Sequence, residues 1–467
     1  MSSPGQSKRR VVFVCRTATG ESLRSAHALR NLDRVELFGI VEGTVGAALR
    51  GRPSEETQCG TLGRPQRAAP TNTDEVFVDT VQVADVHDAD QLIAASRNLI
   101  EKHGPIAHIV TAQETLLEPV AKTREALDVG GMSSATVRRT LDKSLLKSTL
   151  RRAGIQTPPD RVVTSKSDAI RFLSEVGFPI MLKPLSGSGA LATLPIHTAA
   201  DLDHALQLMQ PSPGSPVLAE AYLHGQELCL DTITIDNEPQ LYSICCYYPS
   251  ILEALDHPET QWTCIMPREI DHELYGDFIE QGVAAVRALS VGNSFTHMEG
   301  FLDAHGKLLG FTDATLRPAG ARIGPMLGVS YDVDPYRAWA RVAVDGCFDG
   351  PWQRKYAVGT IFLRGTGSGV VDRVDGADTI TRELRDLIVD TRWPRGGARK
   401  SDTYTGDGYV TLRHHDTSKV KNALEFTRNT VKISYSDPEA NLQWKDRFQN
   451  YQELNRPAWE SEHKETQ

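Results

Sequence analysis

The sequence has no excess of basic residues and no long hydrophobic run. The formal net charge of -9 argues against general nucleic-acid binding, because that function needs a basic face. No apolar stretch approaches the roughly 18 residues that a membrane-spanning helix needs. The apolar segment after the basic residues near the start is also too short for a signal peptide. We therefore expect a cytoplasmic protein that binds neither nucleic acid nor a membrane.

Cysteine is sparse, and the common nucleotide-binding fingerprints are missing. The seven cysteines are odd in number and show no CxxC spacing. This pattern indicates free thiols in a reducing compartment, not a disulfide framework or a zinc site. Neither the GxxxxGK[ST] pattern nor the GxGxxG pattern occurs. A nucleotide site in this chain would have to be built in another way.

The composition is that of a globular protein, and the order of elements indicates an α/β fold. A chain of 467 residues with 40% hydrophobic and 24% charged residues is long enough for two to four structural units. Strands and helices alternate in the first part, which predicts a Rossmann-like domain over residues 1–130. We expect these elements at residues 9–15, 21–32, 35–43, 88–104 and 106–112. Residues 51–75 are polar and rich in Gly and Pro, which predicts a loop.

The stretch FTDATLRPAG (311–320) has the character of a site. Asp313, Thr315 and Arg317 alternate, so they share one face of an extended segment. The segment before it reads as a hairpin whose turn is AHGK, which could bring Glu299 opposite Asp313. Two carboxylates that face a phosphate would hold Mg²⁺, because this ion prefers oxygen ligands. Without a cation, the same pair would repel.

A second segment, KPLSGSGA, follows an apolar strand. Lys183 would supply a positive charge, and the small residues Ser186, Gly187, Ser188 and Gly189 would let backbone N–H groups approach a phosphate. An ordinary flexible turn is the alternative interpretation.

Two further segments carry candidate residues with weaker signals. Glu220 and Glu227, in LAEAYLHGQEL, could accept hydrogen bonds from an adenine amino group and from ribose hydroxyls, or they could be surface glutamates. Lys143 lies in a segment that predicts a single helix ending at Gly154. A solvated helix lysine is the alternative interpretation for it.

The order of these pieces resembles the ATP-grasp superfamily. Five segments follow one another within roughly residues 85 to 435. They are a lysine in DK, FPIMLKP with its Gly/Ser loop, E-x6-E, H-x-E and DATLRPAG. Within the superfamily, the chain looks most like carboxylate–amine ligases of the L-amino-acid ligase and carnosine synthase type. The resemblance implies an ATP-grasp fold (α/β, or α+β) behind the Rossmann-like domain. It implies a central subdomain over residues 131–217 and a C-terminal subdomain over 218–467.

The resemblance also implies roles for individual residues, with ATP and Mg²⁺ (or Mn²⁺) as cofactors. The ATP phosphates would be held by Lys143, Lys183 and the loop Ser186 to Gly189. The adenine hinge would be Glu220, Ala221, Tyr222 and Leu223, and Glu227 would bind the ribose. Metal ligands would be Glu299, Asp313 and Thr315. Arg317 would neutralise the acyl phosphate and act in catalysis together with Lys183.

The chain departs from the usual pattern at two positions. The family commonly has Glu at the position of Asp313 and Asn at the position of Thr315. These differences leave open whether the site holds a second metal ion. An inactive, nucleotide-binding regulator is therefore one alternative. A carboxylase that acts through carboxyphosphate is another, although no biotin-attachment segment occurs.

The implied reaction joins an amino acid or small carboxylic acid to an amine through an acyl phosphate. Gly320 and Arg322 are candidates for substrate binding, and a surface arginine is the alternative for Arg322. His297 could face the metal or the amine, or it could be a structural histidine. Trp262 and Met266 could border the substrate pocket or pack in the core. The resemblance implies small-molecule substrates and a possible homodimer.

Overall fold

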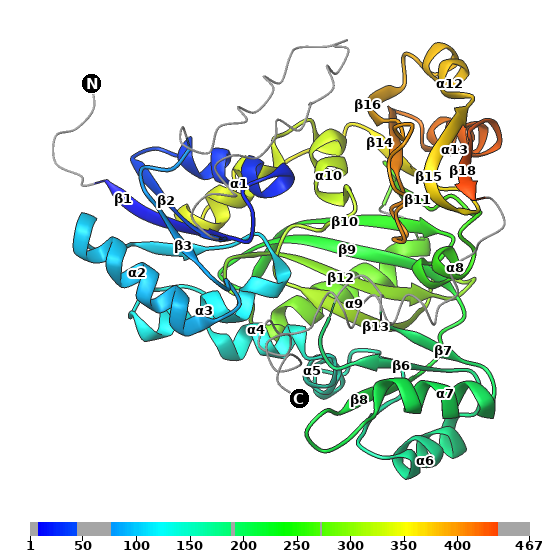
Figure 1. Cartoon of the computed structure of the whole chain (residues 1–467), viewed down its shortest axis with the longest axis horizontal. Coiled ribbons are helices and arrows are strands. Elements are labelled where there is room, and N and C mark those ends of the chain that lie inside the picture. Colours follow the sequence, from blue (N-terminus) through cyan, green and yellow to red (C-terminus); the bar gives the residue numbers. More distant parts are fainter. Residues whose placement is uncertain (1–7, 44–75, 188–191, 271–272, 438–467) are drawn as a thin grey trace, which may run out of the picture.

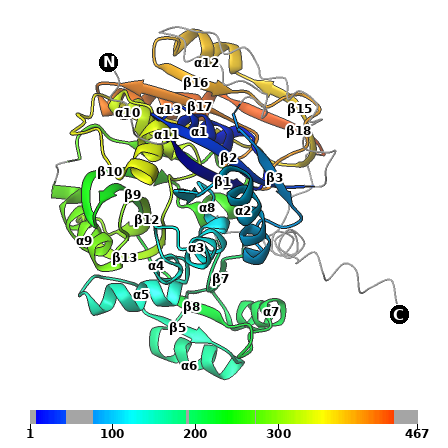
Figure 2. The same cartoon turned by 90° about the vertical axis from the view of Figure 1, so that its left-hand side faces the viewer.

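The computed structural model describes residues 8–43, 76–187, 192–270 and 273–437. The whole predicted loop at 51–75, the residues Ser188 and Gly189, and the charged tail beyond Asp437 lie outside these ranges. The described strands form four sheets, which Figure 1 shows from one side and Figure 2 from a perpendicular side. The predicted mixed α/β fold is confirmed.

The N-terminal sheet is parallel, with the strand order β3-β2-β1-β4. Its strands are β1 (Arg9–Cys15), β2 (Val35–Glu42), β3 (Thr80–Val83) and β4 (His108–Val110), and its helices are α1 (Gly20–Arg30), α2 (Ala89–His103) and α3 (Leu117–Ala126). β1 can lie inside the sheet because its residues from Val11 to Cys15 are all apolar and fully buried. The carboxyl ends of such strands form the edge at which α/β proteins commonly bind ligands.

The single helix predicted before Gly154 is wrong, because Asp142 divides it. α4 (Ser134–Leu141) ends at Asp142, and the same residue caps α5 (Lys143–Arg152). The Asp142 carboxylate accepts hydrogen bonds from two backbone N–H groups of the first turn of α5. The break makes Lys143 the first residue of a new helix and places Lys147 one turn further along it.

The second sheet is small and antiparallel, with the order β5-β8-β6-β7. It consists of β5 (Asp160–Val163), β6 (Ile180–Pro184), β7 (Leu194–Ile196) and β8 (Val217–Ala221), together with α6 (Lys166–Val176) and α7 (Ala199–Met209). The two helices share one apolar core with the sheet, at the lower end of the molecule in both views. The boundary expected at residue 217 coincides with the first residue of β8, and the division into domains stays a prediction.

The largest sheet has eight strands in the order β13-β12-β9-β10-β11-β14-β17-β16. The strands are β9 (Gln226–Ile235), β10 (Glu238–Tyr248), β11 (Thr263–Met266), β12 (Ser294–Leu302), β13 (Leu308–Thr315), β14 (Ala357–Leu363), β16 (Ile388–Arg392) and β17 (Gly408–His414). A separate pair, β15 (Ser368–Asp375) and β18 (Lys432–Asp437), lies beside its far end. The predicted hairpin is confirmed as β12 and β13.

Helices cover both faces of this sheet. They are α8 (Ile251–Asp256), α9 (Glu273–Leu289), α10 (Ile323–Tyr331), α11 (Pro335–Ala340), the π-helical turn η3 (Arg341–Asp345), α12 (Ala377–Glu383) and α13 (Thr417–Thr430). The N-terminal sheet packs against the same unit, since Phe13 of β1 meets Trp339 of α11 edge to face at 6.2 Å. One apolar core therefore joins the first and last thirds of the chain.

No helix within the described residues has the length and apolar character needed to cross a membrane. The expected cytoplasmic location stays a prediction. The six described cysteines are free thiols, as predicted, and five of them are buried.

Candidate active site

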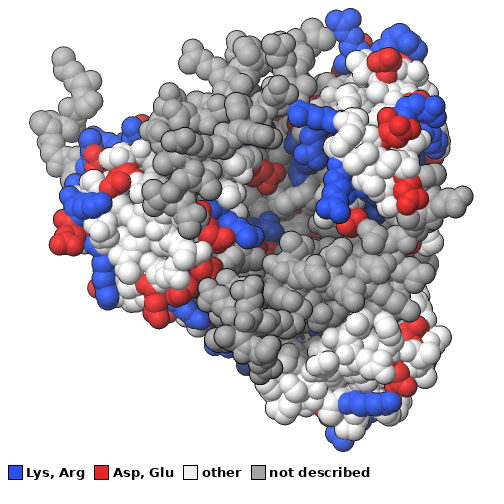
Figure 3. Space-filling model, viewed as in Figure 1, with Lys and Arg blue, Asp and Glu red and all other residues white. Residues whose placement is uncertain are grey.

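Two adjoining cavities are lined by residues of the small antiparallel sheet, the eight-stranded sheet and the segment after β4. The large cavity is lined by residues of β6, β8 and α8, and the small cavity by residues of β12, β13 and the start of α10. Both are lined by Ile251, Glu299, Asp313 and Tyr404, so these residues stand between them. Figure 3 shows the molecule hollowed between its N-terminal and C-terminal parts, with Lys and Arg side chains on the C-terminal wall.

The two predicted metal carboxylates face each other across the hairpin. Glu299 of β12 is directly opposite Asp313 of β13 in the antiparallel register. The ammonium group of Lys143 lies 2.7 Å from the Asp313 carboxylate. Burial alone would raise the pKa of Asp313, but the Lys143 charge holds it below its usual value. The acid pair therefore does not depend on a metal ion to offset its repulsion.

Thr315 and Arg317 lie on the small-cavity side, as their spacing predicted. The Thr315 hydroxyl is buried and has no hydrogen-bond partner among the described residues. A buried unpaired hydroxyl is costly, which indicates that a bound group or water completes it. The Arg317 guanidinium forms an ion pair with Glu114 and donates to the Pro318 carbonyl at 2.7 Å.

A cluster of buried charges lies at the wall of the large cavity. Glu220 of β8 is 2.6 Å from the ammonium of Lys147 and 2.9 Å from that of Lys183. Burial alone would raise the pKa of Glu220, but the two lysines hold it below its usual value. The carboxylate expected to meet adenine is thus also a shared partner of two lysines. Sequence reasoning missed Lys147, although its spacing of four from Lys143 puts both on one helix face.

The other predicted nucleotide-binding residues line the large cavity. They are Lys143, Ser186, Gly187, Ala221, Tyr222, Leu223 and Glu227. Lys143 also donates to the Gly187 carbonyl at 2.9 Å, which ties α5 to the Gly/Ser loop. Glu227 accepts a hydrogen bond from the Ile251 N–H at 2.7 Å. Its pKa is raised to about 8, chiefly by burial and then by the nearby charge of Glu299.

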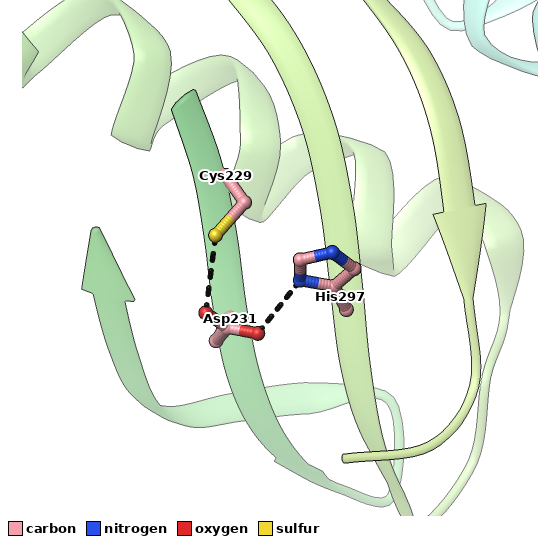
Figure 4. Close-up of side chains that lie close together, drawn as sticks. All are labelled: Cys229, Asp231 and His297. Carbon is pink, nitrogen blue, oxygen red and sulfur yellow. Dashed lines mark hydrogen bonds and ion pairs between the residues drawn. The ribbon is translucent and has the colours of Figure 1, made fainter. Parts of the chain in front are cut away.

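His297 lies between two carboxylates, as Figure 4 shows in part. Its Nδ1 is 2.9 Å from the Asp231 carboxylate, and its Nε2 is 3.4 Å from that of Glu299. Asp231 also accepts a hydrogen bond from the Cys229 thiol at 3.3 Å. The ring lines the small cavity, yet both of its nitrogens have protein partners. These contacts favour the interpretation as a structural histidine, and they place it directly behind Glu299.

The remaining substrate candidates divide into two groups. Gly320 and Trp262 line the small cavity. Arg322 and Met266 are not among the residues that line either cavity in the described part of the chain. The Arg322 guanidinium instead pairs with Asp390 and stacks 4.0 Å from the centroid of the Tyr409 ring. This placement favours a structural role for Arg322.

Sequence reasoning missed Glu114 and Tyr404, two other residues that line the small cavity. Glu114 follows β4 at the carboxyl edge of the parallel sheet, a position that could have indicated it. Tyr404 comes from the loop between β16 and β17, and its ring packs edge-on against Trp262 at 4.8 Å. No local pattern marks Tyr404, since only the fold brings this loop to the cavities.

Comparison with known proteins places this geometry in context. No family model matches the sequence. The chain is 24% identical over 278 residues, 57% of its length, to the L-arginine-specific L-amino acid ligase of Bacillus subtilis. The match spans 65% of that relative, which is less than two thirds of its length.

Solved structures match over nearly the whole chain. An L-amino acid ligase from Bacillus licheniformis superposes with a TM-score of 0.68 at 15% identity, covering 93% of this chain and 100% of the other. The N5-carboxyaminoimidazole synthetase from Staphylococcus aureus, solved with ADP, gives 0.62 at 14% identity, covering 91% and 98%. The ATP-grasp fold predicted from the order of the motifs is thereby confirmed.

Proposed function

We propose that this protein is an ATP-dependent carboxylate–amine ligase that joins an amino acid, or another small carboxylic acid, to an amine or a second amino acid. The observation that carries the proposal is the acid pair Glu299 and Asp313 between two cavities. Lysines lie on one side of the pair, and Arg317 lies on the other. The similarity to an L-amino acid ligase supports the same class of reaction.

The large cavity suits ATP. Lys143 and Lys183 supply buried positive charges at one end, where a triphosphate would lie. The segment from Ala221 to Leu223 offers backbone groups for the adenine edge, and Glu227 offers a carboxylate for the ribose. A neighbour with the same fold was solved with ADP, which supports a nucleotide in this cavity.

The acid pair and Thr315 fit a divalent cation. Two carboxylates and an unpaired buried hydroxyl, all oxygen donors, line the same small cavity. Glu299, Asp313 and Thr315 would hold Mg²⁺, or Mn²⁺ in its place. The ion would neutralise phosphate charge during transfer. The shorter Asp313 side chain and the neutral Thr315 leave open whether one ion or two are held.

The small cavity would bind the carboxylic acid. A carboxylate oxygen attacks the γ-phosphorus of ATP, the bond to the β–γ bridging oxygen breaks, and ADP leaves. The amine nitrogen then attacks the acyl carbon, loses a proton, and inorganic phosphate leaves as the amide forms. Arg317 would neutralise the acyl phosphate and the oxyanion that follows it. Catalysis by these residues would consist mainly of positioning and charge neutralisation.

The test is ADP release from Mg·ATP with single and paired amino acids and small carboxylic acids, with mass spectrometry of the products. L-Arginine belongs in the first set, because the curated relative carries arginine specificity in its name. Release that needs one acid and one amine, with a product mass equal to both minus water, is the expected result. Release that needs bicarbonate would favour the carboxylase alternative. ATP binding without release under any mixture would favour the regulator.

The assembly state is a separate proposal. We expect a homodimer, and sedimentation velocity of the purified chain measures it directly.

A further inference from the structure

Lys147 is a completely buried lysine beside the large cavity. Its side chain has 0% exposure, and its ammonium group is held by two groups of the protein. It donates to the Thr312 carbonyl of β13 at 3.0 Å and lies 2.6 Å from the Glu220 carboxylate. An ammonium group in such a place is costly unless it is paired. Burial lowers the pKa of Lys147 to about 8, although Glu220 partly offsets the effect.

Lys147 does not line either cavity, unlike the groups around it. Glu220, Lys183 and Thr312 all line the large cavity, and Lys147 lies behind them. It therefore acts on a bound nucleotide only through these neighbours. The same Glu220 oxygen, Oε2, faces both Lys147 and Lys183.

We propose that Lys147 is a positioning residue that keeps Lys183 available to the phosphates of ATP. It does so by serving as the permanent counterion of Glu220. This inference rests on the proposed ATP site in the large cavity, but not on the ligase reaction.

Glu220 and a bound phosphate would compete for the ammonium group of Lys183. Without Lys147, Glu220 would be a buried carboxylate whose nearest described cation is Lys183, and a buried charge with one partner holds that partner strongly. Lys183 would then have to leave Glu220 unpaired whenever it turned toward a phosphate. With Lys147 in place, Glu220 keeps one buried partner at 2.6 Å whichever way Lys183 turns.

The ion pairs support this division of roles. They join three lysines, Lys143, Lys147 and Lys183, to two carboxylates, Glu220 and Asp313. Lys143 is engaged by Asp313 and Lys147 by Glu220. Lys183 is the lysine left over for an added anion.

The test compares the binding of ATP with that of adenosine by titration calorimetry. The ratio of the adenosine Kd to the ATP Kd measures what the phosphates contribute. We expect Lys147→Met to lower this ratio roughly 10- to 100-fold, as for one lost hydrogen bond to a charged group. Adenosine binding itself should stay unchanged, and Lys147→Arg should restore the ratio in part. Lys166→Met, at an exposed lysine of α6, is the matched control and should leave the ratio as in the wild type.

A double variant separates this role from a merely structural one. In Lys147→Met/Glu220→Gln the carboxylate charge is gone, so nothing holds Lys183 and the ratio should recover to that of Glu220→Gln alone. This comparison also serves if Lys147→Met alone does not fold. A ratio in Lys147→Met equal to that of the wild type overturns the proposal. A ratio in the double variant lower than that of Glu220→Gln overturns it as well.

The outcome for the ligase is read separately. A wild type that binds ATP no more tightly than adenosine overturns the inference together with the nucleotide site. Normal ATP binding without any amide product overturns only the proposed reaction.

Discussion

Replacing Asp313 with Asn tests the centre of the site most directly. The change keeps the shape of the side chain and one carbonyl acceptor, but it removes the charge. Asp313 faces Glu299 across the hairpin and is 2.7 Å from the Lys143 ammonium. We expect the variant to lose stability without ligand and to lose the part of ATP binding that depends on Mg²⁺.

The size of the stability loss follows from the contact with Lys143. Breaking a buried ion pair by removing one partner costs about 3–5 kcal/mol. The Asp313 side chain is 28% exposed to the cavity, Asn keeps an acceptor, and Lys143 keeps the Gly187 carbonyl at 2.9 Å. We therefore expect a loss of about 2 kcal/mol, the middle of the range for a hydrogen bond to a charged group.

The assay is urea unfolding of the wild type and the variant without nucleotide, with ATP and EDTA, and with Mg·ATP. A ligand at 100 times its Kd stabilises the folded state by about 2.7 kcal/mol. The wild type should gain more from Mg·ATP than from ATP with EDTA, whereas Asp313→Asn should gain equally from both. Asp372→Asn, at an exposed carboxylate of β15, is the control. A variant with wild-type stability and a wild-type response to Mg·ATP would refute the reasoning.

Three further changes test other parts of the structure. Tyr404 lines both cavities, and Tyr404→Phe keeps its ring but removes its hydroxyl. ADP release should slow by up to about tenfold, as for one neutral hydrogen bond, with an unchanged melting temperature. Gly225→Ala would place a Cβ 2.2 Å from the Leu302 carbonyl oxygen, so urea unfolding should show a loss of about 1–3 kcal/mol and calorimetry a weaker ATP site. Asp168 has a pKa below its usual 3.8 because the Ser165 hydroxyl, above all, hydrogen-bonds its carboxylate. A lowered pKa stabilises the fold above pH 3.8 and ceases to do so as the pH falls through the pKa of the folded state. Asp168→Asn should therefore be less stable than the wild type at pH 6, and the difference in stability should shrink below pH 3.8. An equal difference at every pH would contradict this.

The hairpin shows why some of the site could be read from the sequence. A short polar turn between two apolar strands predicts the hairpin that brings Glu299 near Asp313. Two register shifts, between Phe301 and Leu302 and between Glu299 and Gly300, then set Asp313 directly opposite Glu299. Alternation then puts Asp313 and Thr315 on one face. The pairing of the two strands and this alternation need no knowledge of the rest of the chain, whereas the two register shifts do not follow from the local pattern.

Other predictions were wrong or incomplete because a local pattern had two outcomes. The helical spacing before Gly154 continues through Asp142, yet this residue caps a new helix, since its carboxylate competes for the N–H groups of the next turn. Arg322 follows Arg317 in the chain but turns to Asp390 and Tyr409, which lie about seventy to ninety residues further along.

The sequence by itself determined the class of fold and most of the segments that line the large cavity. The order of short motifs, each with its own local periodicity, was enough for the ATP-grasp fold and for the segments that line the large cavity. Those residues sit on strand ends and adjacent loops, where local spacing sets the direction of a side chain.

Only the tertiary structure decided which charges share a partner and which distant loops close the site. Lys147, Glu220 and Lys183 come from α5, β8 and β6, and no spacing along the chain reveals that one carboxylate serves both lysines. Tyr404 reaches the cavities from the loop between β16 and β17, the two strands at one end of the eight-stranded sheet. Electrostatic partners are chosen by distance and burial in the folded state, and both arise from packing between segments far apart in sequence.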